Sequence, residues 1–146
     1  MEFIIKTKKS KNEIAQILQK NTSEKIRIFC EYDEFFNGEI LEESFKIQRN
    51  ITYKNSFLPV IIGKIKETEN GSEIYIKMRL NHLVKGFMTF WFSFVILFCL
   101  IMPFINFDLP FCLIPYIMLA FGILLVTIPN RIETKVAKKK LEELLR

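Results

Sequence analysis

The stretch GFMTFWFSFVILFCLIMPFINFDLPFCLIPYIMLAFGILLVTI, residues 86–128, decides the architecture of this chain. Its single charged residue is Asp108, close to its middle. A helix on the surface of a soluble domain keeps one polar face, and this stretch has none. The segment NFD at 106–108 divides it into two apolar runs, residues 86–105 and 109–128. Each run is about 20 residues long, which is the length that a helix needs to cross a bilayer. The stretch therefore predicts a transmembrane helical hairpin.

Basic residues on either side of the hairpin predict its orientation. Lysines and arginines precede the first run and follow the second, whereas the connection between the runs has none. Positively charged flanks stay on the cytoplasmic side, so both termini are expected in the cytoplasm. Trp91 lies about two turns inside the first run; it either sits at the interface or packs against the second helix. The predicted membrane-interface residues are Arg79, His82, Lys85, Trp91, Arg131 and Lys135.

Composition limits the partners and cofactors of the chain. A formal net charge of +5 on an apolar protein indicates membrane topology and anionic lipid rather than nucleic acid, so no nucleic-acid partner is expected. The chain has three cysteines, one histidine and no CxxC motif, which excludes a structural zinc site. Apolar packing is the expected role of Cys99 and Cys112. No metal and no cofactor is predicted.

Residues 1–85 predict a cytosolic α+β domain. A first strand at residues 2–8 is followed by a helix, because Ser10 and Glu13 form a capping-box pattern ahead of an apolar stripe. The helix is expected to stop near Asn21. Alternating patterns then predict five antiparallel strands at residues 25–32, 35–41, 44–53, 58–66 and 72–80.

The expected architecture is a curved antiparallel sheet of about six strands with one helix. Turns are predicted at 42–43 and at Asn70-Gly71, where both residues accept the positive φ of a type I′ hairpin. Gly38 marks a bulge or a close approach of two strands. The pattern leaves open whether the sheet closes into a barrel.

Three regions follow from this pattern. The cytosolic domain covers residues 1–85, the hairpin residues 86–129, and a basic amphipathic helical tail residues 130–146. Pro129 and Asn130 are expected to end the second membrane helix. The tail is either a solvated helix whose lysines reach lipid headgroups or a helix that binds a partner or a second copy.

The sequence shows no catalytic constellation, and an enzyme is not expected. It has no P-loop, GxSxG, HExxH or dinucleotide-binding motif. His82 is the single histidine, and it stands at the membrane entry without a carboxylate or nucleophile near it in sequence. An interfacial role is the expected one for this side chain.

One charged residue falls on an apolar strand face. Arg49 alternates with Phe45 and Ile47, so it either turns outward at a bulge or strand end, or it is buried. A buried guanidinium needs a carboxylate, a group of carbonyls or an anionic ligand. The buried alternative predicts an anion site helped by Lys54 or Lys64. Asn55 lies in a neighbouring segment that is either a turn or a ligand-binding loop. The candidate ligand residues are Arg49, Lys54, Asn55 and Lys64.

Several motifs in this half resemble an uncharacterised family of small bacterial membrane proteins. They are FFNGEI, FKIQR, YKNSFLPVIIG from Tyr53 to Gly63, and the GSEI strand that leads into the first membrane run. The resemblance covers about residues 35–90 and excludes the tail beyond Asn130. It implies a fold-level grouping of two-helix membrane proteins with a β-rich cytosolic domain, and it carries no assigned activity.

The expected function is therefore that of a non-enzymatic protein of the bacterial inner membrane. Its cytosolic domain would sense a ligand or partner and couple it to the hairpin, through self-association or through a membrane protein partner. One alternative is a membrane-disrupting effector of a bacterial defence system, activated by a small anionic signal. Another is a membrane scaffold or immunity-type partner protein.

Overall fold

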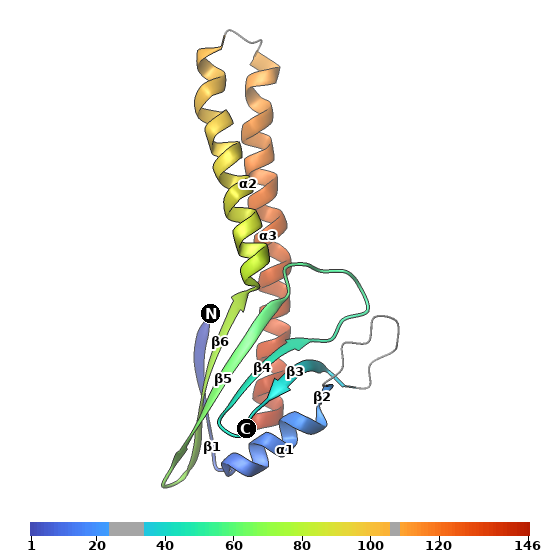
Figure 1. Cartoon of the computed structure of the whole chain (residues 1–146), viewed down its shortest axis with the longest axis vertical. Coiled ribbons are helices and arrows are strands. Elements are labelled where there is room, and N and C mark those ends of the chain that lie inside the picture. Colours follow the sequence, from blue (N-terminus) through green and yellow to red (C-terminus); the bar gives the residue numbers. More distant parts are fainter. Residues whose placement is uncertain (24–33, 106–108) are drawn as a thin grey trace.

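The structure is a computed structural model, which describes residues 1–23, 34–105 and 109–146 (Figure 1). The predicted strand at 25–32 lies outside the described residues. In chain order the elements are β1 (Glu2–Thr7), α1 (Lys11–Lys20), β2 (Thr22–Ser23), β3 (Phe36–Ile40), β4 (Ser44–Arg49), β5 (Pro59–Thr68), β6 (Gly71–Leu80), α2 (His82–Ile101), the 3-10 helix η1 (Met102–Phe104) and α3 (Leu109–Leu145).

The strands form one open, six-stranded sheet in the order β1-β6-β5-β4-β3-β2. The predicted α+β class is confirmed, and the sheet does not close because β1 and β2 remain its edges. All neighbours are antiparallel except β2 and β3, so the expectation of a wholly antiparallel sheet is wrong at this edge. The two residues of β2 continue directly from the end of α1, where the N–H of Phe36 donates to the carbonyl of Asn21 at 3.0 Å.

Two local signals in the N-terminal half were predicted, and one of them is confirmed in full. Ser10 caps α1 and forms the predicted capping box with Glu13. The β5–β6 hairpin is also present, but its turn residues are Glu69 and Asn70, and Gly71 already lies in β6 with a φ of +128°. The type I′ prediction is wrong, because Asn70 does not adopt a positive φ. Glycine is needed at 71 because a Cβ there would lie 2.2 Å from the carbonyl oxygen of Thr7.

The sheet and the first long helix are joined by a single residue. β6 ends at Leu80 and α2 begins at His82, with Asn81 between them as the N-cap; its Oδ1 accepts from the N–H of Leu83 at 3.0 Å. Two helices, His82–Phe104 and Pro110–Leu145, are long and apolar enough to cross a membrane. They project together from one end of the sheet (Figure 1).

The second long helix does not stop where the sequence predicted. α3 continues through Pro129 to Leu145, although a proline inside a helix removes the N–H that would bond the carbonyl four residues earlier. Packing overrides this loss, because Ala137, Leu141 and Leu145 are fully buried against the sheet. The segment 130–146 is therefore not a separate solvated tail, because its apolar face is buried on the sheet. It is the sheet-bound half of α3 (Figure 1).

One face of the sheet carries the core, and α1 and α3 cover it. Ile14 and Leu18 of α1 are fully buried, as expected from their spacing. The strands contribute the residues that alternate inward, which are Ile5, Phe36, Phe45, Ile47, Ile61, Ile65, Ile74, Ile76 and Met78. The ring of Phe45 lies over Gly63, its cross-strand partner, where a Cβ would collide with it. The opposite face of the sheet is exposed.

The contribution of α3 to this core can be measured directly. Leu141→Ala removes a fully buried side chain and should lower the free energy of unfolding of the sheet domain by about 3 kcal/mol. Val136→Ala on the same helix, where the side chain is 37% exposed, should cost less than about 1 kcal/mol. Amide hydrogen exchange of β5 and β6 in mild detergent measures both. Equal protection in the two variants would show that α3 does not complete the core.

Candidate functional site

A buried carboxylate lies where the sheet meets α3. Glu133 is the only acidic residue of the described chain that is buried, with 2% of its surface exposed. Nη1 of Arg49, at the end of β4, donates to Oε2 of Glu133 at 2.5 Å. Arg49 therefore points inward, and its side chain is 21% exposed. Of the two alternatives left by the sequence, the outward turn is wrong, and the partner of the guanidinium is a carboxylate.

The loop between β4 and β5 makes two more bonds to the same part of α3. The hydroxyl of Tyr53 donates to Oε1 of Glu133, and Nδ2 of Asn130 donates to the carbonyl of Phe57 at 3.1 Å. Both carboxylate oxygens of Glu133 are thus occupied. We call Arg49, Tyr53, Phe57, Asn130 and Glu133 the α3 latch, because together they fasten β4 and the following loop to α3.

The electrostatics of the latch follow from burial and pairing. A buried carboxylate needs charge-assisted partners, and Glu133 has a guanidinium and a phenol. The Arg49 guanidinium also lies over the ring of Phe35, 5.4 Å from its centroid, and Nζ of Lys140 lies 5.5 Å from the same centroid. The hydrogen bond to Glu133 raises the pKa of Tyr53 above its usual value of about 10, and burial adds to this shift.

A pocket of about 400 Å³ opens beside the latch. It is lined by Asn21, Glu34, Phe35, Arg49, Asn50, Ile51, Thr52, Tyr53 and Lys140. The Nε of Arg49 and the Oδ1 of Asn50 are buried here without a hydrogen-bond partner. Because Glu133 already compensates Arg49, the lining is close to neutral, with Lys140 and Glu34 of opposite sign. A polar ligand of modest size that entered this pocket would contact two members of the latch.

The structure does not gather the four predicted ligand residues in one place. Lys54 is exposed in the β4–β5 loop. Oδ1 of Asn55 accepts from the N–H of Phe57 at 2.9 Å, which is the turn that the sequence offered as one alternative. Lys64 lies on the exposed face of β5, the face opposite to Arg49, so the two residues do not form one site.

The predicted interface residues lie where the two long helices leave the sheet. Arg79, His82, Lys85, Arg131 and Lys135 are all exposed, and their role at a membrane interface stays a prediction.

Trp91 takes the second of its two alternatives. A Cβ at Gly122 would come within 2.3 Å of the Trp91 ring, so the indole packs against α3. This contact explains the glycine at 122, since a larger residue would separate the two helices.

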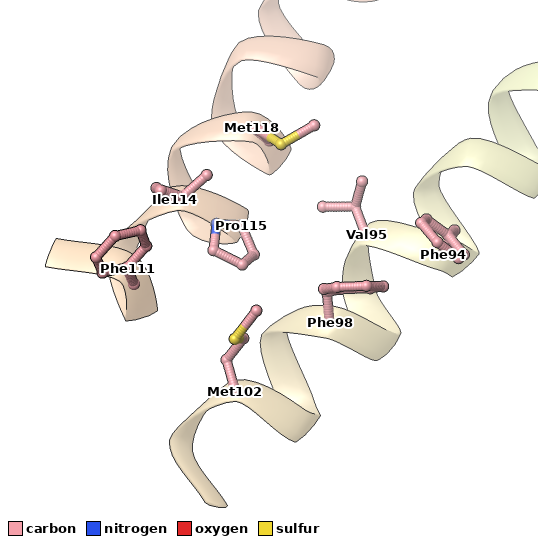
Figure 2. A pocket seen from close by; sticks show the side chains of 8 residues that line it. All are labelled: Phe94, Val95, Phe98, Met102, Phe111, Ile114, Pro115 and Met118. Atoms are coloured by element: carbon pink, nitrogen blue, oxygen red, sulfur yellow. The ribbon is translucent and has the colours of Figure 1, made fainter. Parts of the chain in front are cut away.

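A second hollow, of about 270 Å³, lies between the two long helices far from the sheet. Figure 2 shows Val95 of α2 and Met102 of η1 facing Pro115 and Met118 of α3 across it. Every lining residue is apolar, and none offers a polar group that would orient a ligand. The hydroxyl of Tyr116 instead donates to the carbonyl of Cys99 at 2.9 Å beside it. The lining of this hollow therefore gives no reason to place a ligand-binding or catalytic site there.

Sequence reasoning missed Glu133, although the signal was present. Glu133, Ala137, Leu141 and Leu145 recur every four residues, so one helical face carries a carboxylate at its head. Arg49 has the corresponding place on its strand face. Arg49 and Glu133 are each the one charged residue on an otherwise apolar face. Two such residues of opposite charge predict a buried ion pair.

Comparisons of the chain with protein-family models, with curated proteins and with solved structures find no match. The resemblance to small bacterial membrane proteins therefore stays a prediction. Among the described residues, no group of three or more His, Cys, Asp or Glu side chains is placed to hold a metal ion.

A double-mutant cycle tests the ion pair of the latch. Arg49→Met leaves Glu133 buried without its cationic partner, and should lower the free energy of unfolding by about 3 kcal/mol. The double variant Arg49→Met/Glu133→Leu removes both charges and should be more stable than Arg49→Met alone. Denaturant unfolding in mild detergent gives the four free energies. Additive effects of the two single variants would mean that the pair is not coupled.

The raised pKa of Tyr53 predicts how the stability of the latch changes at alkaline pH. Its pKa is higher in the folded state than in the unfolded state, so the hydrogen bond stabilises the fold below about pH 10. That contribution is lost as pH rises through the folded pKa. NMR titration of ¹³C-tyrosine should show that Glu133→Gln lowers the pKa of Tyr53 towards 10. Tyr75 is the internal control, because its own pKa is raised by Glu73 and should not move.

Proposed function

We propose that this chain is a non-enzymatic, two-pass protein of the bacterial inner membrane, with both termini in the cytoplasm. Its sheet domain senses a ligand or protein partner, and α3 passes the state of that domain to the hairpin. The continuity of α3 carries the proposal, because one helix contributes both to the hairpin and to the core of the sheet.

Membrane insertion is supported by the surface of the two long helices. Their side chains are apolar and point away from the protein, with Phe90 72% and Phe104 88% exposed. A monomeric soluble protein rarely exposes an apolar surface of this extent to water. A soluble core helix would be buried, whereas only 17% and 11% of the most apolar windows of these helices are buried. The cytoplasmic orientation rests on the basic flanks alone.

Coupling is supported by the position of the latch. Arg49 and Tyr53 belong to the sheet and its loop, they line the polar pocket, and they hold Glu133. A ligand or partner that takes hydrogen bonds from Arg49 or Tyr53 would leave a buried carboxylate short of partners. The sheet-bound half of α3 would then have to shift, and the hairpin would move with it because the helix is continuous.

The test measures how tightly α3 is held to the sheet. Spin labels at Lys66→Cys on β5 and Ile117→Cys on α3, in a variant without native cysteines, report the distance between the sheet and the hairpin in bilayers. Both positions are exposed. We expect a narrow distance distribution. Glu133→Gln should broaden it, because Arg49 then has no carboxylate on α3 to pair with. Glu142→Gln, which removes a surface carboxylate of the same helix, should leave it narrow.

Two outcomes would contradict the proposal. An unchanged distribution in Glu133→Gln would show that apolar packing alone fixes α3 and that the latch does not govern the hairpin.

Labelling of intact cells with a membrane-impermeant thiol reagent tests the orientation: Phe104→Cys should react and Lys139→Cys should not. The reverse pattern would place the sheet outside the cytoplasm. Loss of membrane potential on opening the latch would instead favour the effector alternative.

A further inference from the structure

Exposed basic side chains gather at one level of the described structure. Five lysines and arginines lie where α2 and α3 leave the sheet, and we call them the cationic belt: Lys54, Arg79, Lys85, Arg131 and Lys135. The chain has 21 basic and 16 acidic residues, and the five belt residues equal in number its formal net charge of +5.

Strand pairing and helix packing place these residues at a common level. The loop that carries Lys54 leads into Pro59, which pairs with Leu80, the last residue before the cap of α2. Arg79 stands beside Leu80, and Lys85 lies in the first turn of α2.

The belt residues of α3 reach the same level from the other helix. Trp91 packs against Gly122 and Tyr116 bonds Cys99, so the antiparallel register brings the start of α2 beside the Arg131 region of α3. Figure 1 shows the loop and both helices meeting at this end of the sheet.

Among the described residues, no carboxylate forms an ion pair with a belt residue. Residues 44–66 and 74–107 contain no Asp or Glu, and residues 109–141 contain only Glu133. Glu133 is buried and is occupied by the latch. The belt side chains are all exposed, and none forms an ion pair within the part of the chain that the structure describes. Their charges therefore have no ion-pair partner among the described residues.

We propose that the cationic belt binds the phosphate groups of anionic phospholipids and selects them over zwitterionic lipids around the hairpin. This inference rests on the proposed membrane insertion, because the belt borders the apolar surface that would lie in hydrocarbon. Lys and Arg donate to phosphate oxygens, and each basic residue near an anionic surface contributes up to roughly a fivefold preference. Tyr53 in the belt loop is half-exposed, which suits an interfacial position.

The single tryptophan of the chain is a built-in reporter for this proposal. Trp91 lies about two helical turns beyond Lys85 on α2. A phospholipid whose phosphate is bound at the belt would therefore place its acyl chains near the Trp91 ring. Reconstitution of the full chain into phosphatidylcholine vesicles with brominated phosphatidylglycerol gives a relative lipid binding constant from the quenching of Trp91. We expect a several-fold preference for phosphatidylglycerol. The preference should fall clearly in Lys85→Gln/Arg131→Gln/Lys135→Gln, which removes three of the five belt charges, and it should weaken at high salt.

A matched variant separates the belt from charge in general. Lys46→Gln/Lys64→Gln/Lys66→Gln removes three exposed lysines from the sheet face opposite to α1 and α3. This variant should retain the preference for phosphatidylglycerol. Equal binding of the two lipids by the unmodified chain would overturn the proposal, and so would equal loss in the two triple variants.

The same vesicles distinguish failure of this proposal from failure of the proposed function. Brominated phosphatidylcholine alone must quench Trp91 if the chain is inserted, and it must do so in the belt variant if that variant still folds. No quenching would reject membrane insertion itself. Efficient quenching without lipid preference would reject only the belt.

Discussion

A carboxylate that is almost wholly removed from water is stable only where its neighbours replace the hydrogen bonds that it has lost with water. In this protein Glu133 is such a group, and Arg49 and Tyr53 are the neighbours. The three side chains come from a helix, a strand and a loop, so satisfying one charge fixes the relative position of three elements. The alternative arrangements of α3 on the sheet leave a charge buried and unpaired, and this penalty makes the observed docking specific. Apolar packing of Leu141 and its neighbours then supplies most of the stability.

This constraint also explains how α3 tolerates Pro129. The missing backbone hydrogen bond weakens the helix at the boundary between hairpin and sheet. Asn130 and Glu133, one turn further on, are held by the sheet and its loop, so the helix is supported from outside just where its own ladder is interrupted. α3 is thus weakened at Pro129 and held to the sheet just beyond it. This combination suits a helix that couples the position of the hairpin to the state of the sheet domain.

Much of the fold could be predicted because local patterns decide it. The Ser10–Glu13 cap, the alternation of Ile74, Ile76 and Met78, and the two apolar runs each act over a few residues. The fate of residues 130–146 could not be read in this way. Pro129 is a strong local stop signal, and only the distant sheet overrides it. The candidate site was half predicted for the same reason, since Arg49 was recognised as misplaced on its strand face while its partner lies 84 positions later.

The closing of the core by residues on both sides of the hairpin sets the order of biogenesis. Ile5 and Leu145 belong to one hydrophobic cluster, yet the whole hairpin lies between them in sequence. When the strands have left the ribosome, only part of this core has been made, and one face of the sheet stays uncovered until α3 has been synthesised. A failure to place α3 would leave that apolar face open to proteases and aggregation. In the proposed membrane-inserted state, insertion of the hairpin and completion of the sheet domain would be coupled in one folding step.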